Sequence, residues 1–161
     1  MRNDVKDSNE QNNNIERNEE VMCNCRKKEE CPLTGECLRK GVVYQASVEA
    51  DNKIENYIGL TATTFKCRYN NHIASFRNES NRYATELSKY IWTLKDHNKK
   101  FELSRKIVNQ AKPYSNFNKR CNLCTMEKFF IIYKPKMATL NNRCELVSKC
   151  RHSSKFLLIN N

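Results

Sequence analysis

Hydrophobic and polar positions alternate between residues 42 and 48, after a short hydrophobic start, and the alternation is clear from Tyr44 onward. β-Branched and aromatic residues with a period of two are typical of a half-buried strand. Residues 51–53 are polar and predict a turn, and residues 54–60 supply a second strand that ends in Tyr-Ile-Gly. Because the two segments are neighbours in sequence, we expect them to pair as an antiparallel hairpin.

From Thr63 the hydrophobic period lengthens to that of a helix. The large hydrophobic residues that follow are spaced by four, four and three positions: Phe65, Tyr69, Ile73 and Phe76. Arg68 and His72 are also four positions apart, so both project from one side of the predicted helix. They could converge there with a tyrosine hydroxyl from the end of the hairpin.

The rest of the chain predicts further elements by the same periods and by capping and turn residues. In order, we expect a helix over 86–97 capped by Thr85, a strand over 101–108, a loop over 111–119, a helix from about Cys121 to before Pro135, and a last helix over 142–149. The order of elements predicts an α+β fold, with a small, mainly antiparallel three-stranded sheet flanked by helices.

Composition divides the 161 residues into three parts. Residues 1–22 are asparagine-rich and acidic and predict a disordered polar tail without a signal peptide. Residues 23–40 form a cysteine-rich segment, and residues 41–159 form the domain itself. No run of about 18 hydrophobic residues is present, so we expect no membrane-spanning helix and no membrane partner.

Charge favours a polyanionic partner. The formal net charge of the chain is +11; residues 1–22 hold 3 basic and 6 acidic residues, which leaves 26 basic and 12 acidic residues from Cys23 onward, a net charge of +14. Binding of such a protein to phosphates releases counterions, which favours association with nucleic acid. The alternative is a basic protein whose charge serves only solubility.

Several separated motifs resemble the GIY-YIG nuclease superfamily. They are Val-Val-Tyr at 42–44, Tyr-Ile-Gly at 57–59 and the helical arginine Arg68. Flanking segments within residues 31–158 are similar, more narrowly, to the endonuclease domain at the C-terminus of Penelope-like retroelements: CPLTGECLRKGVVYQASV, YIGLT, ELSKYIWTLKD, KPYSNFNKRCNLCTMEK and LNNRCELVSKCRH. The first motif departs from the superfamily pattern Gly-Ile-Tyr but keeps its tyrosine.

Phosphodiester cleavage needs a positioned water, charge stabilisation at the phosphate and help for the leaving oxygen. The resemblance implies that Arg68 holds the scissile phosphate, for which a guanidinium fork is suited. It implies that Glu127 binds Mg²⁺ or Mn²⁺, and that Tyr44 or Tyr57 orients or deprotonates the water. Glu127 lies among hydrophobic residues, where a carboxylate needs a compensating metal or cation. Its rivals by residue type alone are Glu86, Glu102 and Glu145.

Three more residues are candidates for the site. Gly59 would let the substrate backbone approach closely, although a glycine that ends a strand also serves simple turns. His72 would donate to the phosphate, transfer a proton or bind metal, or else be structural. Asn141 aligns with a late asparagine of the family and would hydrogen-bond catalytic groups, with Asn142 as the alternative register.

Nine cysteines in a chain without an export signal favour metal ligation over disulfides. The spacing Cys121-x-x-Cys124 lets two thiolates reach one zinc ion, and Cys150-x-His152 could complete a structural site. The resemblance offers a rival site with Cys31 and Cys37, whose candidate histidines are His152 and His72. Free buried thiols without zinc are the third alternative.

The sequence therefore predicts a metal-dependent DNA endonuclease. The resemblance implies that it nicks target DNA for retroelement integration and exposes a 3′-hydroxyl for a reverse transcriptase of the same element. A DNA substrate in turn favours action in the nucleus. One alternative is a catalytically inactive, zinc-stabilised nucleic-acid-binding module derived from a retroelement. Another is a protein-interaction domain, which salt-insensitive binding to a protein partner would reveal.

Overall fold

A three-stranded antiparallel sheet forms the centre of the molecule, which we describe from a computed structural model for residues 22–111 and 121–142. The strands are β1 (Lys40–Ala50), β2 (Lys53–Thr64) and β3 (Glu102–Gln110), in the order β2-β1-β3. The prediction of an α+β fold with a small antiparallel sheet is confirmed, and the hairpin strands are longer than the sequence pattern indicated.

The hairpin between β1 and β2 closes through a two-residue turn. Ala50 pairs with Lys53, and the two residues between them, Asp51 and Asn52, have φ angles of 50° and 61°. Positive φ at both turn residues gives a backbone twist that matches the right-handed twist of the strands, and Asp and Asn tolerate this conformation better than most residues. The turn therefore fixes the register in which Tyr44 faces Gly59.

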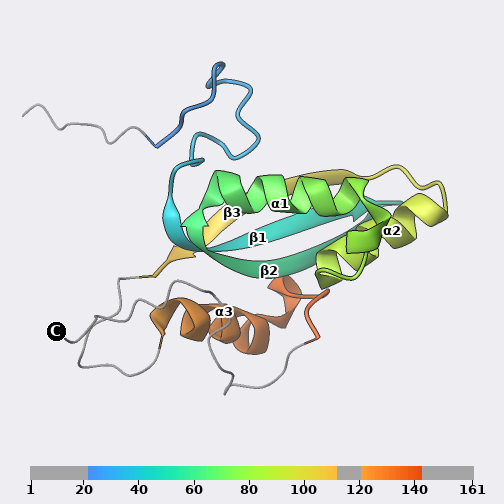
Figure 1. Cartoon of the computed structure of the whole chain (residues 1–161). Coiled ribbons are helices and arrows are strands. Elements are labelled where there is room, and N and C mark those ends of the chain that lie inside the picture. Colours follow the sequence, from blue (N-terminus) through green and yellow to red (C-terminus); the bar gives the residue numbers. More distant parts are fainter. Residues whose placement is uncertain (1–21, 112–120, 143–161) are drawn as a thin grey trace, which may run out of the picture.

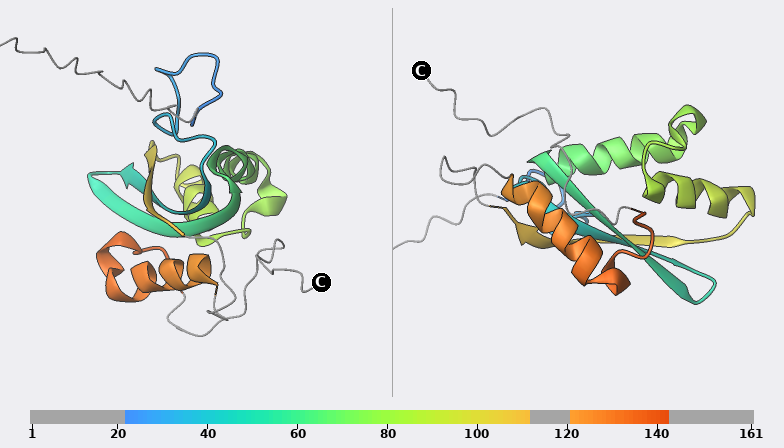
Figure 2. Two further views of the ribbon diagram at one scale, coloured as in Figure 1. Left: turned by 90° about the vertical axis from the view of Figure 1, so that its left-hand side faces the viewer. Right: turned by 90° about the horizontal axis from the view of Figure 1, so that it is seen from below.

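Helices cover both faces of the sheet. One face carries α1 (Phe65–Arg77) and α2 (Glu86–Asp96), and the other carries α3 (Asn122–Tyr133) (Figure 1; Figure 2, left). The hydroxyl of Thr64 accepts from the backbone N–H of Cys67, and that of Thr85 accepts from Ser88, so both helices of the first face begin with a side-chain cap. Two short 3₁₀ helices, η1 (Glu79–Asn81) and η2 (Pro135–Met137), complete the described elements.

The central strand β1 is buried on both faces. Its even-numbered residues from Val42 to Ala50, Tyr44 among them, join the core beneath α1 and α2. Val43 packs with Ile58, Leu123 and Ile131 beneath α3. The prediction of a half-buried strand was therefore wrong for β1. Val42 and Val43 point into two separate hydrophobic cores. For this reason both are hydrophobic, and hydrophobic and polar residues alternate only from Tyr44 onward.

Some expectations lie outside the described residues. These are the polar tail up to residue 21, the loop over 112–119, and the last helix from residue 143 onward. No helix within the two described ranges is long and apolar enough to cross a membrane.

Candidate active site and metal centre

Tyr44 lies at the centre of the predicted site. Its side chain projects from β1 toward α1 and is only 1% exposed. The Nε of Arg68 donates to the Tyr44 hydroxyl oxygen at 2.9 Å, and the same hydroxyl lies 2.9 Å from Nε2 of His72. The helical spacing of four thus brings Arg68 and His72 to one tyrosine, as the sequence predicted.

Tyr57 and Gly59 complete the hairpin side of the site. Gly59 pairs with Tyr44 across the strands. A Cβ on Gly59 would lie 2.5 Å from the Tyr44 hydroxyl oxygen and 2.8 Å from Cε1 of Tyr57. A glycine is therefore required at this position, because any side chain would collide with the two tyrosines. Their ring centroids are 6.5 Å apart. Close approach of a substrate to Gly59 stays a prediction.

Burial controls the protonation of both tyrosines. It raises the pKa of Tyr44, and Arg68 only partly opposes this effect. Burial, followed by the neighbouring Tyr44, raises the pKa of Tyr57 as well. The lowered phenol pKa that a base would need is therefore not supplied by the chain alone. In this arrangement the hydroxyls can orient a water molecule as hydrogen-bond partners.

His72 is neutral in the folded chain. Burial, together with the positive charges of Arg68 and Arg105, lowers its pKa to about 3. Because Arg68 donates to the Tyr44 oxygen, the phenol hydrogen is available to Nε2 of His72, which then accepts it. This network assigns the remaining proton to Nδ1, a buried atom without a hydrogen-bond partner in the described part of the chain.

The depressed pKa of His72 predicts a loss of stability in acid. As the pH falls from about 6.5 toward about 3, the unfolded chain binds a proton that the folded chain excludes, so the unfolding free energy should fall by up to about 1.4 kcal/mol per pH unit. Chemical denaturation at a series of pH values measures this slope. In His72→Gln the unfolding free energy should no longer fall in this way as the pH is lowered. In His97→Gln, which changes a histidine at the exposed end of α2, the fall should be the same as in the wild type. Equal slopes for the wild type and His72→Gln would contradict the assignment.

Asn141 holds the edge of β2 beside the tyrosines. Its Oδ1 accepts from the backbone N–H of Ile58 at 2.8 Å, and its Nδ2 donates to the Ile58 carbonyl at 2.8 Å. Ile58 lies between Tyr57 and Gly59, so this asparagine fixes the backbone that carries both. It is Asn141, and not Asn142, that makes these two bonds.

Glu127 lies on α3, which covers the face of the sheet opposite to α1. It is half-buried on α3, and its negative charge contributes to the raised pKa of Tyr44 and of Tyr57. Of its rivals, Glu86 lies 3.9 Å from Lys89 on α2, and Glu102 is exposed opposite Glu49. The third rival, Glu145, lies outside the described residues.

Arg105 is a residue of this region that the sequence analysis missed. It is buried on β3, lies over the ring of Tyr69 at 4.8 Å, and helps to lower the pKa of His72. Its Nε and Nη2 have no hydrogen-bond partner among residues 22–111 and 121–142. A signal was present, since an arginine occupies a hydrophobic position of the strand, midway between Leu103 and Ile107.

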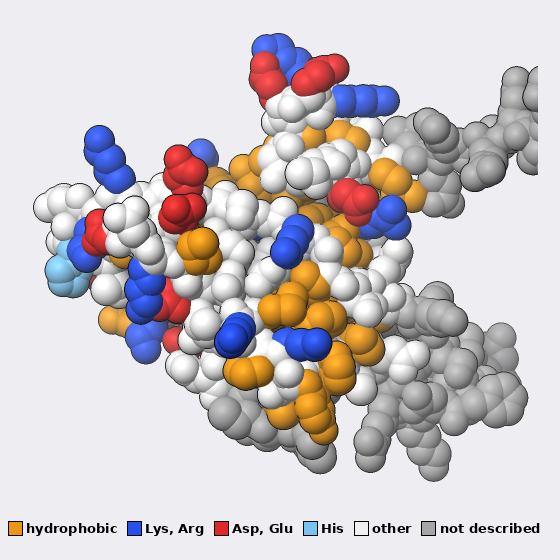
Figure 3. Space-filling view, turned by 180° about the vertical axis from the view of Figure 1, so that it is seen from behind, with side chains coloured by type: hydrophobic (Ala, Val, Ile, Leu, Met, Phe, Trp, Pro, Cys, Tyr) orange, Lys and Arg blue, Asp and Glu red, His pale blue; other side chains and the backbone are white. Residues whose placement is uncertain are grey.

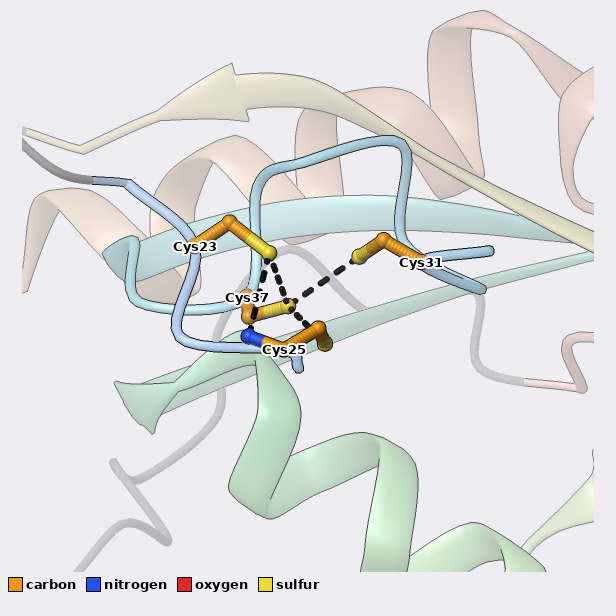
Figure 4. A group of neighbouring side chains, drawn as sticks. All are labelled: Cys23, Cys25, Cys31 and Cys37. Atoms are coloured by element: carbon orange, nitrogen blue, oxygen red, sulfur yellow. Dashed lines mark hydrogen bonds between the residues drawn. The ribbon is translucent and has the colours of Figure 1, made fainter. Parts of the chain in front are cut away.

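Four cysteines converge beside the first turn of α1. The Sγ of Cys37 lies 3.4 Å from that of Cys23, 3.3 Å from that of Cys25 and 3.1 Å from that of Cys31 (Figure 4). All four sulfurs are within 4.8 Å of one another, and such a group could hold a metal ion such as zinc. We call these four residues the cysteine cluster.

The cysteine cluster differs from the sites that the sequence predicted. Cys31 and Cys37 belong to it, but Cys23 and Cys25 join them in place of histidines, and His72 is bound to Tyr44 instead. The other predicted set is only partly described: Cys121 and Cys124 lie at the start of α3, whereas its last two members fall outside the described residues. That set stays a prediction.

A half-buried arginine, two buried phenols and a neutral imidazole thus lie together on the α1 side of the sheet, and the carboxylate of Glu127 acts on the phenols from α3. No protein-family model matches the chain, and no curated protein or solved structure is significantly similar to it. The resemblance to GIY-YIG nucleases consequently stays a prediction that rests on the motifs of the sequence.

Proposed function

We propose that this chain is a metal-dependent DNA endonuclease of the GIY-YIG type, which hydrolyses phosphodiester bonds. The observation that carries the proposal is the chain of contacts from Arg68 through Tyr44 to His72, with the charge of Glu127 acting on the same tyrosines. The proposed site thereby joins residues separated by more than 80 positions in the sequence. Perturbed titratable groups gathered in this way are typical of active sites.

Arg68 would bind the scissile phosphate. Its Nε is fixed on the Tyr44 hydroxyl, which orients the planar guanidinium before any substrate arrives. A fixed cation lowers the cost of reorganisation as charge develops on the phosphate oxygens. Arg105, which is buried on the same face of the sheet, would add positive potential to the same region.

Glu127 would hold the metal ion. A half-buried carboxylate whose charge acts on both tyrosines is a hard oxygen ligand of the kind that Mg²⁺ and Mn²⁺ prefer, so the residues present fit such an ion. When bound, the ion supplies charge stabilisation at the phosphate and at the leaving oxygen. Tyr44 and Tyr57 would orient the attacking water, and the neutral His72 would accept a hydrogen bond from the Tyr44 hydroxyl and keep it in place.

The charge of the chain supports DNA as the substrate. The net charge is +11, and basic side chains are spread across one face of the molecule, interspersed with acidic ones (Figure 3). Such a distribution provides general attraction to a phosphate backbone rather than recognition of particular bases. By the resemblance to Penelope-like elements, the nick would serve retroelement integration in the nucleus, with a reverse transcriptase of the same element as partner.

Relaxation of supercoiled plasmid tests the proposal. The purified chain should nick plasmid with Mg²⁺ or Mn²⁺ and stop when EDTA is added. Glu127→Gln should reduce the nicking rate about 100-fold or more, because it removes the ligand charge. Glu102→Gln, which changes an exposed carboxylate on β3, should cut at the wild-type rate.

The second candidate function is a catalytically inactive nucleic-acid-binding module. The raised pKa of both tyrosines favours it, because neither phenol is poised to act as a base in the chain alone. A folded wild-type chain that binds DNA with strong salt dependence but leaves plasmid supercoiled with either metal would establish this function and overturn the endonuclease.

A further inference from the structure

We propose that the cysteine cluster holds one Zn²⁺ through four thiolates, and that this zinc site fixes the N-terminal end of helix α1. The inference is independent of the proposed nuclease function. It assigns Cys23, Cys25, Cys31 and Cys37 as the ligands.

The sulfur positions suit a tetrahedral zinc ion. Four sulfurs at about 2.3 Å from zinc are about 3.8 Å from one another in tetrahedral geometry. The four Sγ atoms already lie within 4.8 Å of one another, and three of these distances are between 3.1 and 3.4 Å. A small movement outward from Cys37 would therefore admit the ion. An all-sulfur donor set selects a soft or borderline metal and disfavours Mg²⁺ or Ca²⁺.

The segment that carries the ligands has little else to hold it. Between Met22 and Arg39 it contains no helix or strand, and its buried hydrophobic residues are Leu33 and two of the cysteines. Residues 26–30 are all charged and exposed. Burial of one leucine does not offset the entropy of ordering such a segment, whereas the binding of a structural zinc ion contributes directly to the stability of the folded state.

The loop between Cys31 and Cys37 is shaped for a thiolate. Thr34 and Gly35 have φ angles of 51° and 83°, which reverse the chain and return Cys37 toward Cys31. The backbone N–H of Cys25 donates to the Cys23 sulfur at 3.5 Å. Backbone donors aimed at sulfur are the outer-shell contacts that stabilise a metal-bound thiolate.

The same segment caps helix α1. The backbone N–H of Lys66 donates to the Cys37 carbonyl at 2.9 Å, and that of Phe65 donates to the Arg39 carbonyl at 2.8 Å. These are first-turn donors that have no partner inside the helix itself. The Nζ of Lys66 also donates to Oδ1 of Asn24 at 2.8 Å. Figures 1 and 4 show the segment beside the start of α1, so the zinc site would set the position of the helix that carries Arg68.

Metal content of the purified full chain is the first test. We expect one zinc per chain for the wild type and for Cys67→Ser, whose thiol is exposed on α1 outside the cluster. Cys37→Ser should lose the metal. Substitution of Co²⁺ should give the absorption bands of a tetrahedral cobalt thiolate in the wild type. Zinc that survives Cys37→Ser but is lost in Cys124→Ser would overturn the assignment, and so would a wild type without zinc and without those bands.

Chelation tests the contact with α1. Removal of the metal from the wild type should lower the melting temperature by at least about 5 °C and speed hydrogen exchange at the backbone amides of Phe65 and Lys66. Amides in the middle of α2 should change less. Unchanged protection of the first turn of α1 after metal loss would overturn the positional role. This readout needs no variant and therefore holds even if Cys37→Ser fails to fold.

Discussion

Replacing Arg68 by alanine is expected to reduce plasmid nicking about 10³-fold or more, with little change in DNA binding. Arginines that stabilise the charge of a transferring phosphoryl group contribute effects of this size in other enzymes. Arg68 has a fixed orientation through its bond to Tyr44, so its loss removes the cation and also frees the central tyrosine. Initial nicking rates at saturating metal ion, beside DNA affinity at one salt concentration, measure the two effects separately.

Two variants sharpen this prediction. Arg77→Ala removes an exposed arginine from the last turn of the same helix and should cut at the wild-type rate. Arg68→Lys keeps the charge but not the planar fork, so an intermediate rate is expected. If Arg68→Ala is folded and its nicking rate stays within tenfold of the wild type, Arg68 does not hold the phosphate.

Gly59→Ala is expected to destabilise the fold by about 3 kcal/mol, the upper range for overpacked cores. Its Cβ would lie 2.5 Å from the Tyr44 hydroxyl oxygen and 2.7 Å from Cζ of the same ring. This ring cannot move aside without breaking its contacts with Arg68 and His72. Chemical denaturation measures the change in unfolding free energy, and nicking of the folded fraction should fall as well.

Gly41→Ala is the matched control for this glycine. Its Cβ would meet only the Ala111 carbonyl oxygen at an ordinary 3.7 Å, although its φ of 62° makes any side chain strained. We expect a cost of about 1 to 2 kcal/mol from that strain alone. A smaller loss for Gly59→Ala than for Gly41→Ala would show that the tyrosine pair can relax, contrary to the packing role described for Gly59.

The spacing of hydrophobic residues in the sequence predicted those parts of the candidate site that lie on a single helix or on two strands adjacent in sequence. The spacing of Arg68 and His72 fixes both on one side of α1, and the hairpin brings Gly59 opposite Tyr44. The helical and strand periods are direct consequences of backbone geometry, so they can be read without knowledge of the tertiary fold. The boundaries of the helix that carries Glu127 were also close to those observed.

The features that were not predicted depend on tertiary packing or irregular backbone. The cysteine cluster is assembled by a segment without regular structure, in which Thr34 and Gly35 adopt positive φ, so the spacing of its cysteines follows no helix or strand period. Likewise, the burial of β1 on both faces depends on α3, which lies far away in sequence. Arg105 occupies a position where the strand pattern calls for a hydrophobic residue, and its stacking on Tyr69 becomes apparent only with α1 in place.

The asparagine at residue 141 also has a consequence for self-association. Strand β2 lies at the edge of the sheet, where unpaired backbone groups could recruit a strand from a second molecule. The segment that ends at Asn141 occupies these groups: the N–H of Leu140 donates to the Asn56 carbonyl, and the asparagine amide pairs with both backbone groups of Ile58. The chain thereby blocks sheet extension along this edge, a common route to aggregation, at the residues that flank Tyr57.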